Sequence, residues 1–301
     1  MYDIIGDIHG HYNDLVNLLR ALGYNNDSGY FKHRDRKVIF VGDFIDRGIN
    51  QKKLLNEVMK MVKHGYAIAS QGNHELNAIF FSEKNNKGDY LRDHSKENIF
   101  QHKAFLDDLT FGSSDYDLVI NWFKDLPVFL ELDGFRVVHA AWIDESINFL
   151  KNNLIDGKLN QDFIRKCWDS QSDEFKHIER ALKGLEVVLP DGLTWHDKKN
   201  NKIRNTMRVN WFSNVKSKTY KNCAMSFPNP EILPDKEIDF EFDIYSEQIP
   251  VFFGHYWLQG KPQIQTDYTA CLDYSVAKNG KLVCYRWNGE SRLKNENFFH
   301  I

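Results

Sequence analysis

The chain has 301 residues, of which 42% are hydrophobic and 27% charged, as is ordinary for a globular protein with a buried core. Its formal net charge of −3 gives no electrostatic reason to expect specific nucleic-acid binding or attachment to a membrane surface. The four cysteines lie far apart without a C-x-x-C pair, which excludes a local cysteine-rich zinc motif and favours a reducing compartment. Because the sequence lacks a signal-peptide pattern and any apolar run of about 18 residues, we expect a cytoplasmic protein.

Short apolar runs alternate with helical patterns in the first part of the chain. The runs typical of buried strands are residues 2–5, 37–41 and 66–70. Apolar side chains recur at helical spacing in residues 11–22 and 51–64, with Gly65 as a helix stop. A third helix is predicted to start near His74. This β-α-β-α-β-α order predicts an α/β fold with parallel strands.

Chemically unusual residues follow each predicted strand. The first three strands end in the sequences GDIHG (6–10), GDFIDRG (42–48) and GNHE (72–75). Further along, apolar residues 135–138 run into His139, and residues 250–253 run into Gly254 and His255. Because the carboxyl ends of parallel strands meet at one edge of a sheet, we expect these side chains to lie close together.

Asp43 and Asp46 crowd two like charges into four residues. Such carboxylates repel one another unless a cation lies between them or each has its own partner. Mixtures of histidine and aspartate suit Mn, Fe, Zn or Ni, and the two oxygens of Asp43 can bridge two ions. A water shared by two ions loses a proton near neutral pH and can attack phosphorus. Alternatively, the strand-end histidines are structural, and Asp46 caps the helix that follows it.

In this order, the blocks GDIHG, GDFIDRG, GNHE, His139 and GH (254–255) resemble those of the calcineurin-like metallophosphoesterases. The resemblance points to the phosphoprotein phosphatase branch and its bacterial relatives, which are serine/threonine phosphatases and diadenosine tetraphosphatases. It implies an αββα sandwich of two mixed sheets, with a dinuclear metal site at the carboxyl edge of the strands. It also implies a single domain over residues 1–301, with a poorly matched insertion or cap at about 144–247.

The resemblance also implies a set of metal ligands. One ion would be held by Asp7, His9 and Asp43, and the other by Asp43, Asn73, His139 and His255. The expected cofactor is a pair of divalent ions. Mn is the first choice of metal, and Fe, Zn, Ni and Mg are the alternatives.

Catalytic and substrate-binding roles follow from the same resemblance. His74 would be the general acid that protonates the leaving oxygen, and Asp46 would orient it. Arg47 would hold phosphate oxygens by a forked contact, and Asn73 would also contact the substrate. The family commonly uses a second arginine, for which we predict Arg204, with Arg208 as the fallback.

Three functions remain open at this point. The first is hydrolysis of phosphomonoesters, such as phosphorylated side chains of proteins. The second is symmetrical hydrolysis of a dinucleoside polyphosphate, and the third is an inactive phosphate-binding scaffold. The tetraphosphatases typically lack the second aspartate of GDxxDRG and read GNHD, whereas this sequence has Asp46 and Glu75, as protein phosphatases do.

Residues 144–247 interrupt the regular alternation, and their charges segregate. Residues 197–218 contain seven Lys or Arg and one acidic residue, whereas residues 231–247 contain seven acidic residues and one lysine. Within the acidic stretch, EIDFEFDI (237–244) alternates strictly and predicts a strand with one acidic face. We interpret 144–247 as an insertion beside the site, because strand ends 139 and 255 flank it.

Overall fold

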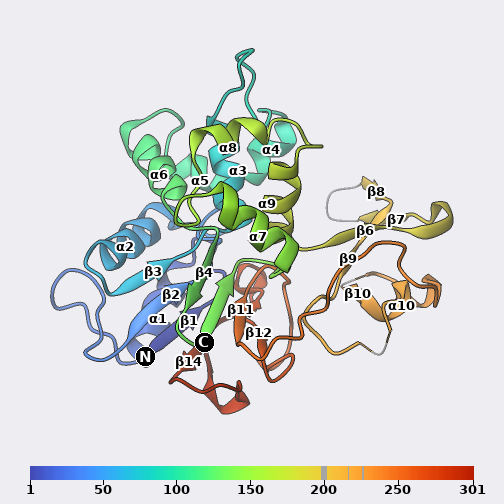
Figure 1. Cartoon of the computed structure of the whole chain (residues 1–301). Helices are drawn as coiled ribbons and strands as arrows, with labels where there is room; N and C mark the ends of the chain where they lie inside the picture. The colour runs from blue at the N-terminus through green and yellow to red at the C-terminus, as the bar shows by residue number, and fades with distance from the viewer. Residues whose placement is uncertain (198–201, 216, 226) are drawn as a thin grey trace.

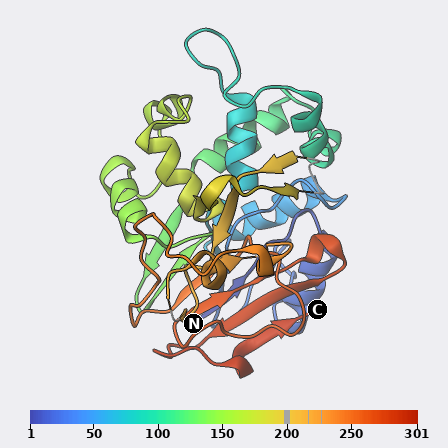
Figure 2. The same cartoon turned by 90° about the vertical axis from the view of Figure 1, so that its right-hand side faces the viewer.

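The computed structural model describes residues 1–197, 202–215, 217–225 and 227–301. Within these residues, two β-sheets lie face to face at the centre, and helices cover their outer surfaces (Figures 1 and 2). The predicted αββα arrangement of two mixed sheets is confirmed.

The first sheet has the strand order β13-β14-β1-β2-β3, with β15 paired to β14. Its strands are β1 (Tyr2–Ile5), β2 (Lys37–Phe40), β3 (Ala67–Ala69), β13 (Asp273–Tyr274), β14 (Lys281–Trp287) and β15 (Phe298–His300). β1, β2 and β3 are parallel, as predicted, and β14 runs antiparallel to β1. Ile5 pairs with Phe40 and Phe40 with Ala69, so the three motif loops leave the sheet at one level.

The second sheet has the order β12-β11-β5-β4. Its strands are β4 (Phe129–Leu132), β5 (Phe135–Val138), β11 (Val251–Phe253) and β12 (Thr269–Cys271). Its β5 and β11 are parallel neighbours, which brings the residues that follow them to one edge. Between the two sheets lies a core that includes Ile4, Ile39, Phe135, Phe252 and Tyr285. Burying each such side chain contributes roughly 1.5–3 kcal/mol.

Helices follow the parallel strands much as the apolar spacing predicts. The first half of the chain contains α1 (Tyr12–Ala21), α2 (Gln51–Lys63), α3 (Asn73–Ser82), α4 (Lys96–Gln101), α5 (Lys103–Asp108) and α6 (Ser114–Lys124). Gly65, just beyond α2, has a φ of +76°, a left-handed conformation that suits a helix stop. The N-cap of α2 is Asn50, so the alternative that Asp46 caps this helix is wrong.

The region 144–247 divides into two structural parts. Its helices α7 (Asp144–Asn153), α8 (Gln161–Lys166) and α9 (Asp173–Lys183) pack into the main core through residues such as Ile147 and Ile178. The rest builds a separate apolar cluster, drawn in yellow and orange at the right of Figure 1. This part contains β6 (Glu186–Val188), β7 (Trp195–Asp197), β8 (Lys202–Arg204), β9 (Thr206–Val209), α10 (Tyr220–Cys223) and β10 (Ala224–Met225). The reading of 144–247 as one insertion stays a prediction.

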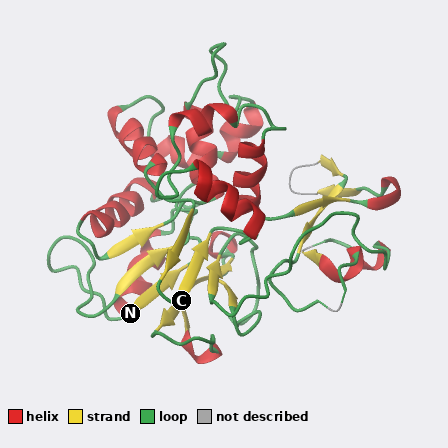
Figure 3. Ribbon diagram, viewed as in Figure 1, coloured by secondary structure: helices red, strands yellow, loops and turns green. Residues whose placement is uncertain are grey.

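Figure 3 shows how far helix and strand are segregated, with most helices gathered above the central strands. Short 3₁₀ turns complete the described secondary structure, and they are Pro190–Gly192, Pro230–Ile232, Val276–Lys278 and Asn295–Asn297. The longest described helix, α2, has 13 residues, whereas a membrane span needs about 20. In the described part of the chain, no helix has the length and apolar character to cross a membrane.

The predicted strand at 237–244 is wrong. Glu237 forms a single bridge with Thr219, and the rest of this stretch lies in no strand. Ile238 and Phe242 are buried in the apolar cluster of the second part, whereas the acidic side chains between them are exposed. The alternation therefore reports which side chains are buried, and it does not reveal whether another strand pairs with this backbone. Of the basic stretch 197–218, residues 198–201 and 216 lie outside the described residues.

Candidate metal centre

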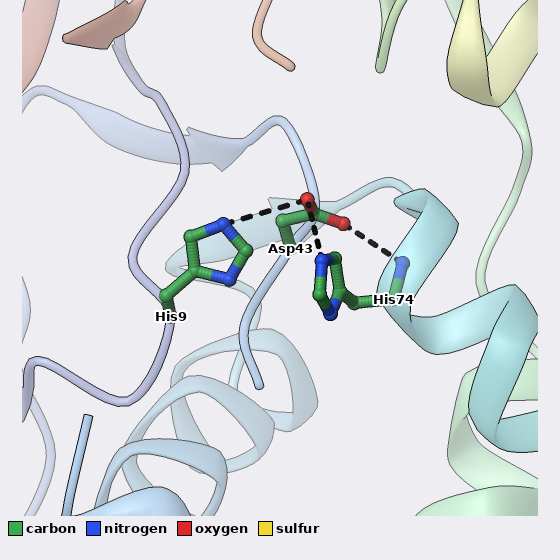
Figure 4. Close-up of side chains that lie close together, drawn as sticks. All are labelled: His9, Asp43 and His74. Atoms are coloured by element: carbon green, nitrogen blue, oxygen red, sulfur yellow. Dashed lines mark hydrogen bonds and ion pairs between the residues drawn. The ribbon is translucent and has the colours of Figure 1, made fainter. Parts of the chain in front are cut away.

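The predicted metal ligands that follow different strands converge on Asp43, at the edge where the parallel strands end. The Oδ2 atom of Asp43 lies 3.3 Å from Nε2 of His139 and 3.6 Å from Nε2 of His9. Figure 4 shows the His9 and His74 rings turned toward this carboxylate. The Nε2 atom of His74 lies 3.9 Å from Oδ2 of Asp43. Asp43 belongs to two groups of candidate ligand atoms within 4.8 Å of one another, one with His9 and His74 and one with His139 and His255. Its position between the groups fits a bridging ligand.

Backbone carbonyls fix how the His9 and His139 rings present their nitrogens. Nδ1–H of His9 donates to the carbonyl oxygen of Ile45 at 2.8 Å, and Nδ1–H of His139 donates to that of Val41 at 2.9 Å. Because a carbonyl oxygen can only accept, the proton must sit on Nδ1 in each neutral ring. Nε2 is then left with a lone pair that faces the centre, as in many metal-bound histidines.

Asn73 and Asp7 complete the set of candidate metal ligands. Oδ1 of Asn73 lies 3.1 Å from Nε2 of His139 and 2.8 Å from Nδ1 of His255. The backbone N–H of His255 donates to Oδ2 of Asp7 at 3.1 Å, which ties the end of β11 to the end of β1. The structure therefore brings the predicted ligands of both sheets into one buried cluster.

Charge in this cluster is poorly balanced by the protein alone. Burial, the Asp273 carboxylate and that of Asp43 hold the pKa of Asp7 well above its usual range. Burial works against the charged form of His139, but the facing Asp43 and Asp7 outweigh it and raise its pKa to about 10. Because the carboxylates of Asp43 and Asp7 stabilise the protonated form of His139 so strongly, the same position should also favour a bound cation.

The residues present fit a pair of divalent ions. Nε2 of His9 and Nε2 of His255 are buried and have no hydrogen-bond partner among the described residues. Burial lowers the pKa of His9 to about 4, so its ring is neutral at pH 7 and can act as a ligand. Buried polar atoms are normally hydrogen-bonded, and a cation at the centre would satisfy Nε2 of His9, which lies 3.6 Å from Oδ2 of Asp43, together with the carboxylates of the cluster.

An unusual backbone holds the ligands in place. His9, Asp43, Asp46 and His255 have φ angles of 48°, 53°, 84° and 72°, which are uncommon for residues other than glycine. Such conformations cost of order 1–3 kcal/mol each and cluster at functional sites. The buried carboxylate of Glu75 offsets part of this cost, because it accepts backbone N–H bonds from Asp43, Phe44 and Gly72 at 2.8, 2.9 and 2.9 Å.

A close approach to the Asp7 side chain explains why the residue before His255 is a glycine, Gly254. A Cβ atom at this position would lie 1.9 Å from Oδ1 of Asp7. Replacing Gly254 with alanine should therefore displace the Asp7 carboxylate and weaken Mn²⁺ binding by at least about 10-fold, a typical effect of disturbing a metal site. Titration calorimetry with Mn²⁺ measures this loss. The control is Gly88→Ala, where nothing lies within 4 Å of the added carbon. Equal affinity in both variants would contradict the placement of Asp7.

His74 and Asp46 form a close pair beside the centre. Nδ1–H of His74 donates to Oδ2 of Asp46 at 2.6 Å. The other oxygen of the carboxylate, Oδ1, accepts from Nδ1–H of a second histidine, His102, also at 2.6 Å. His102 was not predicted from the sequence, because it lies outside every motif and 56 residues from Asp46.

The arginines of the predicted site differ in their relation to the centre. Arg47 is exposed, and its charge acts on the rings of His9 and His74. Arg204 ends β8, paired with Trp195 in a hairpin. Arg208 lies in β9, and its charge helps lower the pKa of His255 after the larger effect of burial. The prediction for Arg204 is thus untested, while Arg208 lies within electrostatic reach of a predicted ligand.

Known proteins are similar to this chain both in sequence and in fold. The sequence is 40% identical over 139 residues to the asymmetrical bis(5'-nucleosyl)-tetraphosphatase PrpE of Oceanobacillus iheyensis, covering 46% of this chain and 54% of the relative. PrpE of Bacillus cereus is 47% identical over 75 residues, covering 24% of this chain and 30% of the relative. The matches thus span about half the length of these curated relatives, or less. A solved structure of a candidate diadenosine tetraphosphatase has a TM-score of 0.50 at 13% identity, covering 100% of this chain and 92% of that one, which shows a shared fold alone.

A family model matches most of the sequence. The model for calcineurin-like phosphoesterases matches residues 2–256. That range includes every predicted ligand from Asp7 to His255, together with His74 and Asp46. The chain therefore belongs to the calcineurin-like phosphoesterase family.

Proposed function

We propose that this chain hydrolyses phosphomonoesters with two divalent metal ions bound around Asp43. The convergence of histidine, aspartate and asparagine side chains on Asp43 supports this proposal, and membership of the family implies divalent metal ions. One ion would be held by Asp7, His9 and Asp43, and the other by Asp43, Asn73, His139 and His255. When bound, the ions, with Mn²⁺ as the proposed metal, would supply Lewis acidity and an activated water nucleophile.

In this proposal, His74 donates the proton that the leaving oxygen needs. Burial lowers its pKa, but the charge of Asp43 and the hydrogen bond to Asp46 outweigh burial and raise the pKa above its usual value. Asp46 stays ionised, because His102 and His74 outweigh the effect of burial and hold its pKa low. With Nδ1–H tied to Asp46, the ring keeps Nε2 for the substrate, on the side that faces Asp43.

Arg47 and a second arginine would bind the phosphate oxygens, and the position of Arg208 favours it over Arg204. Replacing Arg208 with alanine should raise KM for a phosphorylated substrate about 10-fold or more, since a charge-assisted contact contributes about 1.5–3 kcal/mol. The matched control is Arg204→Ala in β8, the strand that precedes β9 in the chain, and steady-state kinetics compare the two variants. A larger effect for Arg204 would restore the assignment predicted from the sequence.

The pairing of His74 with Asp46 favours monoesters of alcohols as substrates. A serine or threonine alkoxide is a poor leaving group that needs a proton as the P–O bond breaks. A phosphate that leaves from an anhydride needs much less help, because it is already a stable anion. A dedicated imidazole and carboxylate pair is therefore most useful for alkyl phosphates.

Hydrolysis of dinucleoside polyphosphates is the second candidate, and two observations favour it. Relatives of this chain carry the name asymmetrical bis(5'-nucleosyl)-tetraphosphatase, whereas the motifs of the sequence had suggested symmetrical cleavage. In addition, Arg47 and Lys278 lie 5.8 and 3.8 Å from the ring centre of Trp257, beside His9. Two cations and an aromatic ring would suit a longer anionic chain that ends in a nucleoside.

A substrate panel with Mn²⁺ tests both candidates. Phosphoserine and phosphothreonine peptides should be hydrolysed at higher kcat/KM than diadenosine tetraphosphate if the first proposal holds. With the tetraphosphate, products separate the two modes of cleavage, since asymmetrical hydrolysis gives ATP and AMP and symmetrical hydrolysis gives two ADP molecules. An inactive scaffold predicts no turnover of any substrate, and the intact cluster of ligands with His74 and Asp46 weighs against it.

A further inference from the structure

His102 is a buried histidine whose ring has one described hydrogen-bonding partner. It lies between α4 and α5, with only 4% of its surface exposed. Phe81 and Phe105 flank the ring at centroid distances of 5.3 and 4.8 Å. Nδ1 contacts Asp46 at 2.6 Å, whereas Nε2 has no hydrogen-bond partner among the described residues. The Nδ1 side of this ring is therefore directed at Asp46.

The carboxylate of Asp46 is held from both sides by imidazoles. Oδ1 accepts from His102 and Oδ2 from His74, each at 2.6 Å. A carboxylate with hydrogen bonds on both oxygens cannot rotate about its Cβ–Cγ bond without breaking them. Because Oδ2 in turn orients the His74 ring, the contact with His102 bears on where Nε2 of His74 points.

A nearby arginine, Arg92, does not take the place of His102 on this carboxylate. The Arg92 guanidinium is close enough for electrostatic interaction with Asp46. Its hydrogen bonds, however, go to Oδ1 of Asn77 at 3.2 Å and to Oε1 of Gln101 at 2.8 Å. Among the described residues, the second hydrogen bond to Asp46 is therefore specific to His102.

We infer that His102 is a positioning residue, which locks the Asp46 carboxylate in the orientation that presents Oδ2 to His74. This inference rests on the proposed function, because it gives His74 the role of general acid. His102 itself does not touch the substrate, and it acts through Asp46. Losing its N–H should leave the carboxylate free to turn and the His74 ring free to swing away from the leaving oxygen.

Two substitutions separate the hydrogen bond from the packing of the ring. His102→Phe keeps an aromatic ring between Phe81 and Phe105 but removes the donor. His102→Asn places an amide N–H close to the position of Nδ1 and restores the donor. We expect His102→Phe to lower kcat on a phosphoserine peptide about 10-fold or more, a typical effect of removing an outer-shell contact. The kcat of His102→Phe on an aryl phosphate should fall less than about threefold, and KM should be nearly unchanged. His102→Asn should recover most of the lost kcat on the phosphoserine peptide.

A matched control is available in His177→Phe. His177 is also buried, stacks on Phe149 and makes one hydrogen bond, to Oγ of Ser146 at 3.0 Å. The His177→Phe variant should leave the ratio of kcat on the phosphoserine peptide to kcat on the aryl phosphate unchanged. In an Asp46→Asn background, His102→Phe should add little. Equal losses on both substrates, failure of the asparagine rescue or full additivity with Asp46→Asn would overturn the positioning role.

A measurement without metal or substrate keeps the inference separate from the proposed function. Proton NMR of the metal-free protein should show the low-field Nδ1–H signal of His74, which His102→Phe shifts and His177→Phe leaves in place. An unshifted signal in His102→Phe would overturn the inference even if the enzyme is active. If the wild type hydrolyses neither substrate, the proposed function fails, whereas a shifted signal still supports the contact. Should His102→Phe not fold, His102→Gln replaces it, because its amide lies one bond further from the backbone.

Discussion

Replacing Asp43 with asparagine is expected to impair both metal positions and to lower kcat/KM by at least about 100-fold. Even outer-shell partners of metal ligands contribute roughly 10- to 100-fold, and Asp43 lies in both groups of candidate ligands. Its pKa is held well below the usual range, because the histidines around it outweigh burial, so the wild-type side chain carries a full negative charge. Asparagine removes that charge and one of the two anionic oxygens.

Metal content and activity should fall together in this variant. Elemental analysis should give two divalent ions per wild-type chain and fewer in Asp43→Asn, and a chelator should abolish wild-type activity. The control is Asp3→Asn, which alters a buried carboxylate paired with Arg36 and Arg286 away from the centre. That variant should lose stability but keep its metal. Full occupancy and full rate in Asp43→Asn would show that the ligand assignment is wrong.

Loss of His74 is expected to depress hydrolysis of alkyl phosphates by about 10²- to 10⁴-fold, the usual contribution of a general acid. The rate of aryl phosphate hydrolysis should fall much less, because an aryl oxide leaves without full protonation. Asp46→Asn should act in the same direction through the same ring, to which it is hydrogen-bonded at 2.6 Å. The double variant should therefore lose less than the product of the two single effects.

His74→Asn, compared on a phosphoserine peptide and an aryl phosphate, is the direct measurement. Metal content must be measured in parallel, because His74 lies in one of the candidate ligand groups with His9 and Asp43. Bound metal that stays nearly intact, with unequal losses of rate, supports the acid role. Equal losses, or loss of an ion, would make His74 a ligand or a positioning group instead.

The composition of the site could be read from the sequence because its residues follow strand ends. A strand-helix-strand order forces parallel neighbours, and parallel neighbours end at one edge of the sheet. Asp7, Asp43 and Asn73 were therefore expected to lie near one another, and β1, β2 and β3 do lie side by side in that order. The bounds of the first helices and strands also agree within a few residues, since the spacing of apolar side chains is a local property.

The tertiary structure alone decided the partners that come from distant segments. His102 lies at a helix junction 56 residues from Asp46 and donates a hydrogen bond to it, and nothing in the neighbouring sequence predicts that this histidine belongs to the site. For the same reason, alternation in 237–244 predicted a strand that has no partner strand beside it. Local patterns encode which face of a segment is buried. Which other segment covers that face depends on the packing of the whole chain, where many weak contacts between remote residues are satisfied at once.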